Sequence, residues 1–214
     1  MTSSTDAEIV SDAINGGDRP PPHAARRPAV FSRSEHDWRP WLEPLPEAGL
    51  SERQQAALID RSRAKSAYFR LLARDPDVLE ARTRVDRDIF LNGRGGLPRA
   101  ERELAAAATS RVNGCIYCAG IHGRFAAQLS QGAIEIDRLL TDGVDADLGP
   151  RWNAIVAAAR ALSATPPAFD AGHVRALRAA GFETEEILDV IQSAAFFNWA
   201  NRLMLSLGEP YLRN

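Results

Sequence analysis

The segment ERELAAAATSRVNGCIYCAGIHGRF, residues 101–125, holds both cysteines of the 214-residue chain and the boundary between two predicted helices. Asn113-Gly114 is a strong break signal, so one helix is predicted to end just before this pair. Cys115 should therefore open a new helix, and Cys118 falls within its first turn or so. The segment thus predicts two consecutive helices with a Cys-x-x-Cys pair at the N-terminus of the second.

The histidine of this segment lies at helical spacing from both cysteines. His122 follows Cys118 by four residues and Cys115 by seven, so a helix of about 3.6 residues per turn places all three on one face. An imidazole can take a thiol proton, and the positive end of the helix dipole favours the thiolate. A peroxide-reducing or disulfide-exchanging site needs these parts. The dipole favours Cys115 as the nucleophile and the histidine spacing favours Cys118, so both assignments stay open.

Three other interpretations of this cluster compete with redox chemistry. A structural zinc site needs four ligands and the chain has no third cysteine, while a catalytic zinc on a single Cys-x-x-Cys-x-x-x-His helix would be uncommon. Haem attachment requires a histidine directly after the second cysteine, where Ala119 stands. The two cysteines could also be small buried packing residues. We rank redox chemistry first, packing second and metal third, and we expect no metal or organic cofactor.

The rest of the chain is predicted to form a succession of helices. Ser51 with Gln54 resembles a capping box, and Pro76 and Pro98 stand where a first helical residue is expected. No convincing alternating strand is found, so the predicted fold class is all-α. The predicted helices are Glu52 to Asp60, Val78 to Phe90, Arg99 to Val112, Cys115 to Ser130, Ile134 to Leu140, Arg151 to Leu162, Ala171 to Ala180 and Glu185 to Leu207.

Composition and local sequence define the organisation and exclude some classes of partner. Residues 1–30 are rich in Gly and Pro and predict a flexible arm, whereas residues 31–214 predict one all-helical domain that begins with an irregular, tryptophan-containing segment. The formal net charge of −2 gives no field that would attract nucleic acid. Apolar stretches are too short for a membrane span, and the first residues do not resemble a signal peptide. We expect a cytoplasmic protein.

The segment at residues 101–122 resembles the alkylhydroperoxidase D-like group of the carboxymuconolactone decarboxylase superfamily. The shared pattern is a glutamate twelve residues before a Cys-x-x-Cys-x-x-x-His motif, and Glu103, not Glu101, stands at that spacing from Cys115. The resemblance extends from about Trp38 to the end of the last predicted helix. It is strongest for stand-alone, peroxidase-related members.

The resemblance implies a multi-helix bundle, association into homo-oligomers and specific roles for four residues. Cys118 would attack the peroxide, Cys115 would resolve the product as a disulfide, and His122 and Glu103 would form a proton relay. The implied partners are an organic hydroperoxide and a thiol or dithiol electron donor, lipoyl-type groups among them. In the best-studied members a second histidine lies between the cysteines. Ile116-Tyr117 stands there instead, and tyrosine cannot act as a base near neutral pH.

Two further functions are consistent with the sequence. The decarboxylase branch of the superfamily acts on a carboxylated lactone by proton transfer and needs no cysteine pair, so a lyase is one alternative. The other is a non-enzymatic, redox-responsive oligomer or metal-binding module, in which a disulfide at the helix start alters assembly. The presence of both thiols favours the thiol peroxidase.

Overall fold

A computed structural model describes residues 26–94 and 96–212 of the chain. Nearly all of the predicted arm at residues 1–30 lies outside the described residues. The elements follow the order β1 (Asp37–Pro40), η1 (Glu47–Gly49), α2 (Glu52–Ala57), η2 (Arg61–Lys65), α3 (Ala67–Leu72), α4 (Pro76–Leu91), α5 (Arg99–Val112), α6 (Ile116–Ser130), α7 (Ala133–Thr141), α8 (Pro150–Ser163), α9 (Ala171–Ala179), α10 (Thr184–Leu207) and β2 (Gly208–Tyr211).

The prediction of an all-helical fold is confirmed, with two local corrections. Each predicted helix is present, and α5 has the predicted bounds, but the short helix α3 was not predicted. The expectation that no strand would be found is wrong, because β1 and β2 form a two-stranded antiparallel ladder. Four residues are too few to show an alternating pattern, and the pairing partner lies at the other end of the chain.

The start signals predicted from sequence are partly realised. Ser51 caps α2 in a capping box, in which its hydroxyl accepts the Gln54 N–H and the Gln54 side chain accepts the Ser51 N–H. Pro76 is the first residue of α4, as expected. Pro98 instead occupies the N-cap position of α5, one residue before the helix begins. Together these signals set helix starts to within about two residues, the usual uncertainty of helix boundaries.

Contacts divide the described chain into two compact units, with boundaries inside α4 and near the end of α10. The first unit comprises residues 36–83 and 206–212 together with 26–27. Its core is a cluster of Leu50, Ala57, Leu58, Ala73 and Leu79. Trp38 of β1 packs edge-on against Tyr68 at a centroid distance of 5.4 Å.

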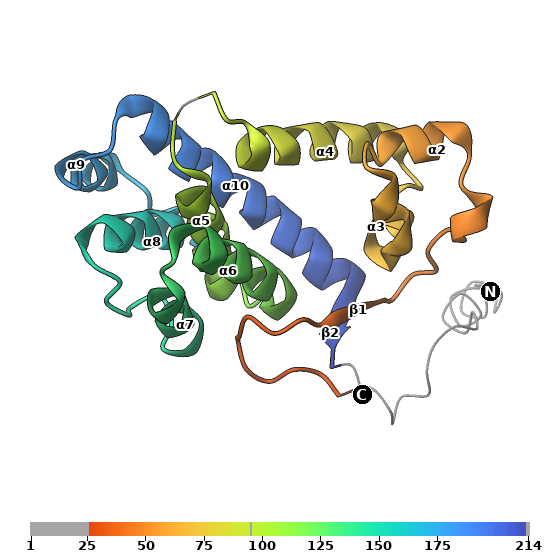
Figure 1. The fold of residues 1–214 in the computed structure, drawn as a ribbon, viewed down its shortest axis with the longest axis horizontal. Helices are drawn as coiled ribbons and strands as arrows, with labels where there is room; N and C mark the ends of the chain where they lie inside the picture. Colours follow the sequence, from red (N-terminus) through yellow and green to blue (C-terminus); the bar gives the residue numbers. More distant parts are fainter. Residues whose placement is uncertain (1–25, 95, 213–214) are drawn as a thin grey trace, which may run out of the picture. The chain divides into compact units, whose positions relative to one another are not determined.

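The second unit comprises residues 28–35 and 84–205, and α5 lies at its centre. α5 packs against α6, α7 and α8 (Figure 1). Its residues 105–108 are all alanine and are all fully buried, which lets neighbouring helices approach closely. The chain then reverses at Gly114, whose φ of +79° is the left-handed conformation common after a helix end. The N–H of Cys115 donates to the carbonyl of Ser110 at 2.9 Å and closes this turn.

Helix α10 supplies much of the remaining core of the second unit. Ile187, Val190, Ala194 and Phe197 of this helix are buried, whereas Leu188 and Trp199 are exposed. The apolar side chains of this helix are therefore only partly covered by the residues that the structure describes.

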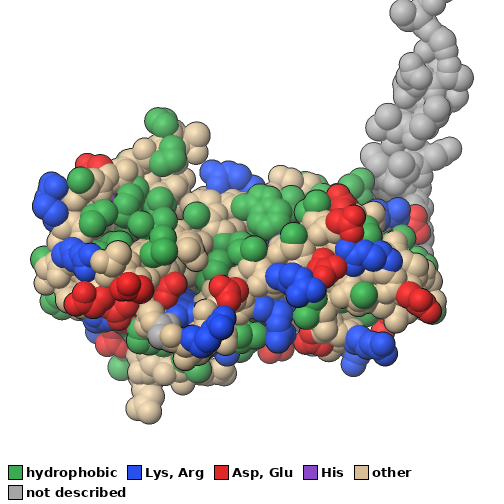
Figure 2. Space-filling model, turned by 90° about the horizontal axis from the view of Figure 1, so that it is seen from above, with side chains coloured by type: hydrophobic (Ala, Val, Ile, Leu, Met, Phe, Trp, Pro, Cys, Tyr) green, Lys and Arg blue, Asp and Glu red, His purple; other side chains and the backbone are tan. Residues whose placement is uncertain are grey.

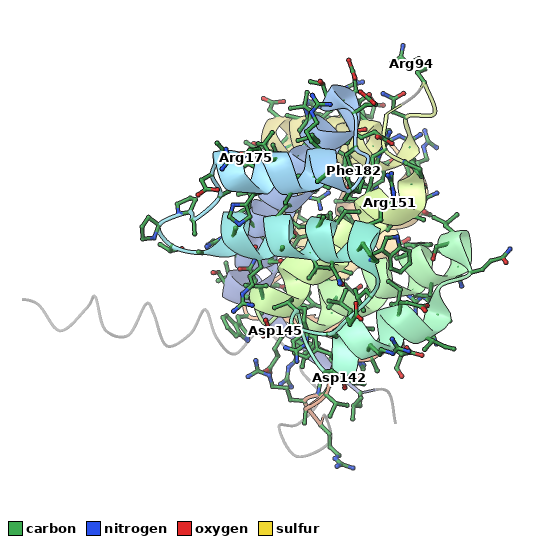
Figure 3. The ribbon with its side chains drawn as sticks, turned by 90° about the vertical axis from the view of Figure 1, so that its left-hand side faces the viewer. Arg94, Asp142, Asp145, Arg151, Arg175 and Phe182 are labelled. Atoms are coloured by element: carbon green, nitrogen blue, oxygen red, sulfur yellow. The ribbon has the colours of Figure 1, made fainter. Side chains whose placement is uncertain are left out.

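A charged cluster joins α8 to α5 and α10. Arg151 of α8 donates to both carboxylate oxygens of Glu101 at 2.7 and 2.8 Å and lies 3.4 Å from Glu186. Its guanidinium also stacks on the ring of Phe182 at 3.9 Å, and both residues are labelled in Figure 3. Hydrogen bonding to Glu101 raises the pKa of Arg151 above its ordinary value. The cluster compensates the burial of the Glu101 carboxylate.

Replacing Arg151 with methionine should therefore destabilise the protein. The change leaves the buried carboxylate of Glu101 without its bidentate partner. Because Arg151 is partly solvated, we expect the free energy of unfolding to fall by about 2 kcal/mol. Urea denaturation measures it. Arg160→Met is the matched control, because Arg160 lies on the same helix and pairs with the exposed Asp145. Equal, small effects of both changes would contradict the structural role of Arg151.

The segment of residues 28–35 packs against α6. A Cβ atom on Gly120 would lie 2.9 Å from the carbonyl oxygen of Ser32, so glycine is required for this close approach. Arg33 forms a bidentate pair with Asp137 of α7, with both distances at 2.7 Å. Arg111 stacks on Phe31 at 4.2 Å. The segment is thus held against α5, α6 and α7.

The Arg33–Asp137 pair should make stability depend on pH. The hydrogen bond from Arg33 lowers the pKa of Asp137, so the pair stabilises the folded state above the unfolded-state pKa of about 4. This stabilisation is lost as the pH falls through the lower, folded-state value. At pH 7 we expect the free energy of unfolding of the wild type to exceed that of Asp137→Asn by at most about 1 kcal/mol, because both side chains are partly solvated. Melting temperatures measured across the pH range follow this difference. The difference should vanish in acid, and a difference unchanged down to pH 2 would contradict this.

Candidate active site

The N-terminus of α6 is capped by a sulfur atom. Cys115 is the N-cap residue, and its Sγ accepts the backbone N–H of Cys118 at 3.4 Å. This is the position usually taken by Ser, Thr, Asp or Asn, whose oxygen satisfies a free N–H of the first turn. Both cysteines are buried and neither is in a disulfide. The two thiols thus lie within one turn at the positive end of the helix dipole.

A carboxylate–imidazole pair lies between α5 and α6. The Nδ1 of His122 lies 2.6 Å from Oε2 of Glu103. The side chain of Glu103 is only 2% exposed and that of His122 is 16% exposed, so the contact is largely shielded from water. Arg99 donates from Nε to the other oxygen of Glu103 at 3.1 Å. A carboxylate held in this way can orient the imidazole and select which ring nitrogen carries the proton.

Two phenylalanines, from helices that are distant in sequence from α6, pack against the imidazole of His122. The His122 ring lies 4.1 Å from the ring of Phe197 on α10 and 5.4 Å from the ring of Phe90 on α4, measured between centroids. Phe90 and Phe197 also contact each other edge to face at 5.7 Å. These contacts restrict the rotation of the imidazole and give it an apolar environment, in which electrostatic interactions are stronger than in water.

The turn before Cys115 is anchored by amide side chains. Asn113 donates to the side-chain oxygens of Asn198 and Asn201 at 2.9 and 3.1 Å. Asn201 in turn donates to the hydroxyl of Ser110 at 3.0 Å, and both of these side chains are fully buried. A buried network with its polar groups satisfied gives the turn a defined geometry.

The structure brings the four residues predicted from sequence onto two adjacent helices. Glu103 contacts His122, and Cys115 is hydrogen-bonded to the backbone of Cys118. Cys118 and His122 lie four residues apart on α6, which places their side chains on one face.

Several neighbours of this cluster were not predicted from the sequence. Arg99 had a signal, because it stands four residues before Glu103 on one helix, the spacing of a helical ion pair. Phe90 and Phe197 had none, since only the packing of α4 and α10 brings them to His122. Asn201 is likewise distant in sequence from the turn that it anchors.

Among the described residues, no group of three or more His, Cys, Asp or Glu side chains is placed to hold a metal ion. None of the described helices is both long and apolar enough to span a membrane. Figure 2 shows one face on which basic and acidic side chains are interspersed with apolar ones.

Comparison with known sequences identifies a family relationship. Residues 76–161, from α4 into α8, match the sequence model of the carboxymuconolactone decarboxylase family. This range includes Glu103, both cysteines and His122. No curated protein matches the chain significantly.

Comparison with solved structures gives similar folds. A peroxidase-related protein with an alkylhydroperoxidase AhpD core from Ralstonia eutropha JMP134 is 26% identical, with a TM-score of 0.65 over 76% of this chain and 87% of that chain. A peroxidase-related protein from Silicibacter sp. TM1040 is also 26% identical, with a TM-score of 0.64 over 78% and 91%. The debrominase Bmp8 is 17% identical, with a TM-score of 0.62 over 77% and 88%, and shows likeness in fold alone.

Proposed function

Because the chain belongs to the alkylhydroperoxidase D-like and carboxymuconolactone decarboxylase superfamily, we propose that it is a thiol-dependent peroxidase. The relatives support a general antioxidant or peroxidase-like role. The thiol mechanism is our proposal, and the contact between Glu103 and His122, one helical turn from Cys118, is the observation that carries it.

In the first step, the thiolate of Cys118 attacks the outer oxygen of an organic hydroperoxide. The O–O bond breaks, the sulfur is oxidised to a sulfenic acid, and the peroxide is reduced to an alcohol. His122 takes the thiol proton and returns it to the leaving alkoxide, while Glu103 stabilises the imidazolium that forms between these transfers.

In the second step, the thiol of Cys115 attacks the sulfenic sulfur of Cys118, and water leaves as the disulfide forms. The Sγ of Cys115 lies 3.4 Å from the backbone nitrogen of Cys118, so the two residues are already neighbours at the start of α6. A dithiol donor then reduces the disulfide and returns both thiols. We propose a reducing cytoplasm as the setting, because reduced donors are available there.

Steady-state turnover tests this function. Reduced protein is supplied with an organic hydroperoxide and a small dithiol donor, and formation of the alcohol is followed. We expect turnover that depends on both substrates and stops when the thiols are alkylated beforehand. Turnover that is no faster than the donor alone would contradict the proposal.

A lyase acting on a carboxylated lactone is the second candidate, and the match to the decarboxylase family model favours it. The Glu103–His122 pair could transfer protons in such a reaction without help from the thiols. Conversion of such a lactone by protein with both thiols alkylated would support the lyase, whereas the absence of conversion by the unmodified protein would contradict it.

A further inference from the structure

We propose that Arg99 is a positioning residue of the proton relay: it fixes the Glu103 carboxylate in the orientation that holds the Nδ1–H of His122. This inference rests on the proposed function, since it assigns Arg99 to the same reaction. Arg99 would act through Glu103 and would not touch the substrate.

Each carboxylate oxygen of Glu103 has its own hydrogen-bond partner. Among the described residues, Oε2 contacts only His122 and Oε1 accepts only from Arg99. An ionised carboxylate can only accept hydrogen bonds, so His122 must donate from Nδ1, which leaves Nε2 as the nitrogen that exchanges protons. A carboxylate that turned away from His122 would lose this selection of the tautomer.

Burial makes the second partner of Glu103 necessary. With 2% of its side chain exposed, the carboxylate cannot recruit water freely, and an unpaired oxygen in such a site is costly. The guanidinium of arginine stays protonated at every physiological pH. Its Nε–H can therefore donate a hydrogen bond to Oε1 of Glu103 without transferring a proton to the relay.

Arg99 is itself held in place by a second contact. Its guanidinium carbon lies 5.3 Å from the centre of the Phe125 ring, one helix away, in cation–π geometry. The Arg99 side chain is 38% exposed, so it connects the buried Glu103 carboxylate with the solvent-exposed surface. The chain of contacts therefore runs from Phe125 through Arg99 and Glu103 to His122.

Histidine ring ¹⁵N NMR, combined with thiol alkylation, tests the inference on reduced, full-length protein. The His122 signals are assigned from their absence in His122→Gln. Wild type should show a hydrogen-bonded Nδ1–H tautomer. Arg99→Met should show a mixture of tautomers and a rate of Cys118 alkylation by iodoacetamide that is about fivefold lower, the effect of losing one partly solvated charged hydrogen bond. Arg99→Lys should restore most of both properties.

Two results would overturn the inference. One is Arg99→Met with the ring shifts and alkylation rate of wild type. The other is a tautomer mixture and an alkylation rate that change equally in Arg99→Lys and Arg99→Met, which would show that a positive charge at residue 99 does not hold the Glu103 carboxylate. If Arg99→Met does not fold, Phe125→Leu replaces it, and the same partial shift towards mixed tautomers is required. Peroxide turnover is measured separately, so an inactive protein with the expected ring shifts would contradict the proposed function and leave the role of Arg99 intact.

Discussion

Replacing Cys118 with serine is expected to abolish reduction of an organic hydroperoxide, with a loss of more than about a thousandfold in rate, as is usual when a catalytic nucleophile is removed. A hydroxyl at this position is not ionised near neutral pH and reacts poorly with peroxide oxygen. The fold should survive, because serine is close in size to cysteine and the backbone N–H of residue 118 still reaches Cys115. Initial rates of alcohol formation measure the loss.

Cys115→Ser provides the matched control, and it should separate the two steps. The serine hydroxyl can replace sulfur as the N-cap acceptor, so α6 keeps its start. The first step then proceeds once and leaves a sulfenic acid on Cys118, detectable as one added oxygen atom by mass spectrometry. Wild-type turnover by both variants would rule out the thiol mechanism, and a sulfenic acid on Cys115 in the Cys118 variant would reverse the two roles.

Replacing Glu103 with glutamine is expected to slow peroxide reduction by about a hundredfold, the lower range for loss of acid–base assistance. The amide has nearly the same shape as the carboxylate and can still accept from Nδ1 of His122. It lacks the negative charge that stabilises the imidazolium formed when His122 takes the thiol proton. The rate of the first step, followed by loss of Cys118 thiol after mixing with hydroperoxide, measures the effect.

Glu101→Gln is the control for this prediction. Glu101 lies on the same helix, is also buried and also pairs with an arginine, Arg151, but it does not contact His122. It should lower stability and leave the rate of the first step unchanged. If both glutamine variants lose activity equally, the loss reflects damage to α5 and the relay is contradicted.

Much of this fold could be predicted because local signals set the helices near the site. The break at Asn113-Gly114 and the helical spacing on either side gave α5 its bounds and placed Cys115 next to α6. The ladder between β1 and β2 could not be predicted in the same way. Its four-residue strands pair across nearly the whole described chain, so the pairing depends on tertiary packing that no local pattern records.

The residues of the candidate site likewise differ in whether local sequence predicts them. Cys118 and His122 lie on α6 and Cys115 is its N-cap residue, so their spacing links the three, and a family resemblance added Glu103 from the preceding helix. The distance of 2.6 Å between Glu103 and His122 is consistent with that addition. Phe90, Phe197 and the asparagines of α10 reach the site only through helix packing. The sequence and the resemblance therefore predicted Glu103, Cys115, Cys118 and His122, and the structure added the side chains that orient them.

The most direct test of the central claim adds one equivalent of an organic hydroperoxide to the reduced protein and counts the free thiols by mass spectrometry. The redox mechanism predicts rapid loss of both thiols as a Cys115–Cys118 disulfide, together with one equivalent of the alcohol. Thiols that remain intact while the hydroperoxide persists would contradict it.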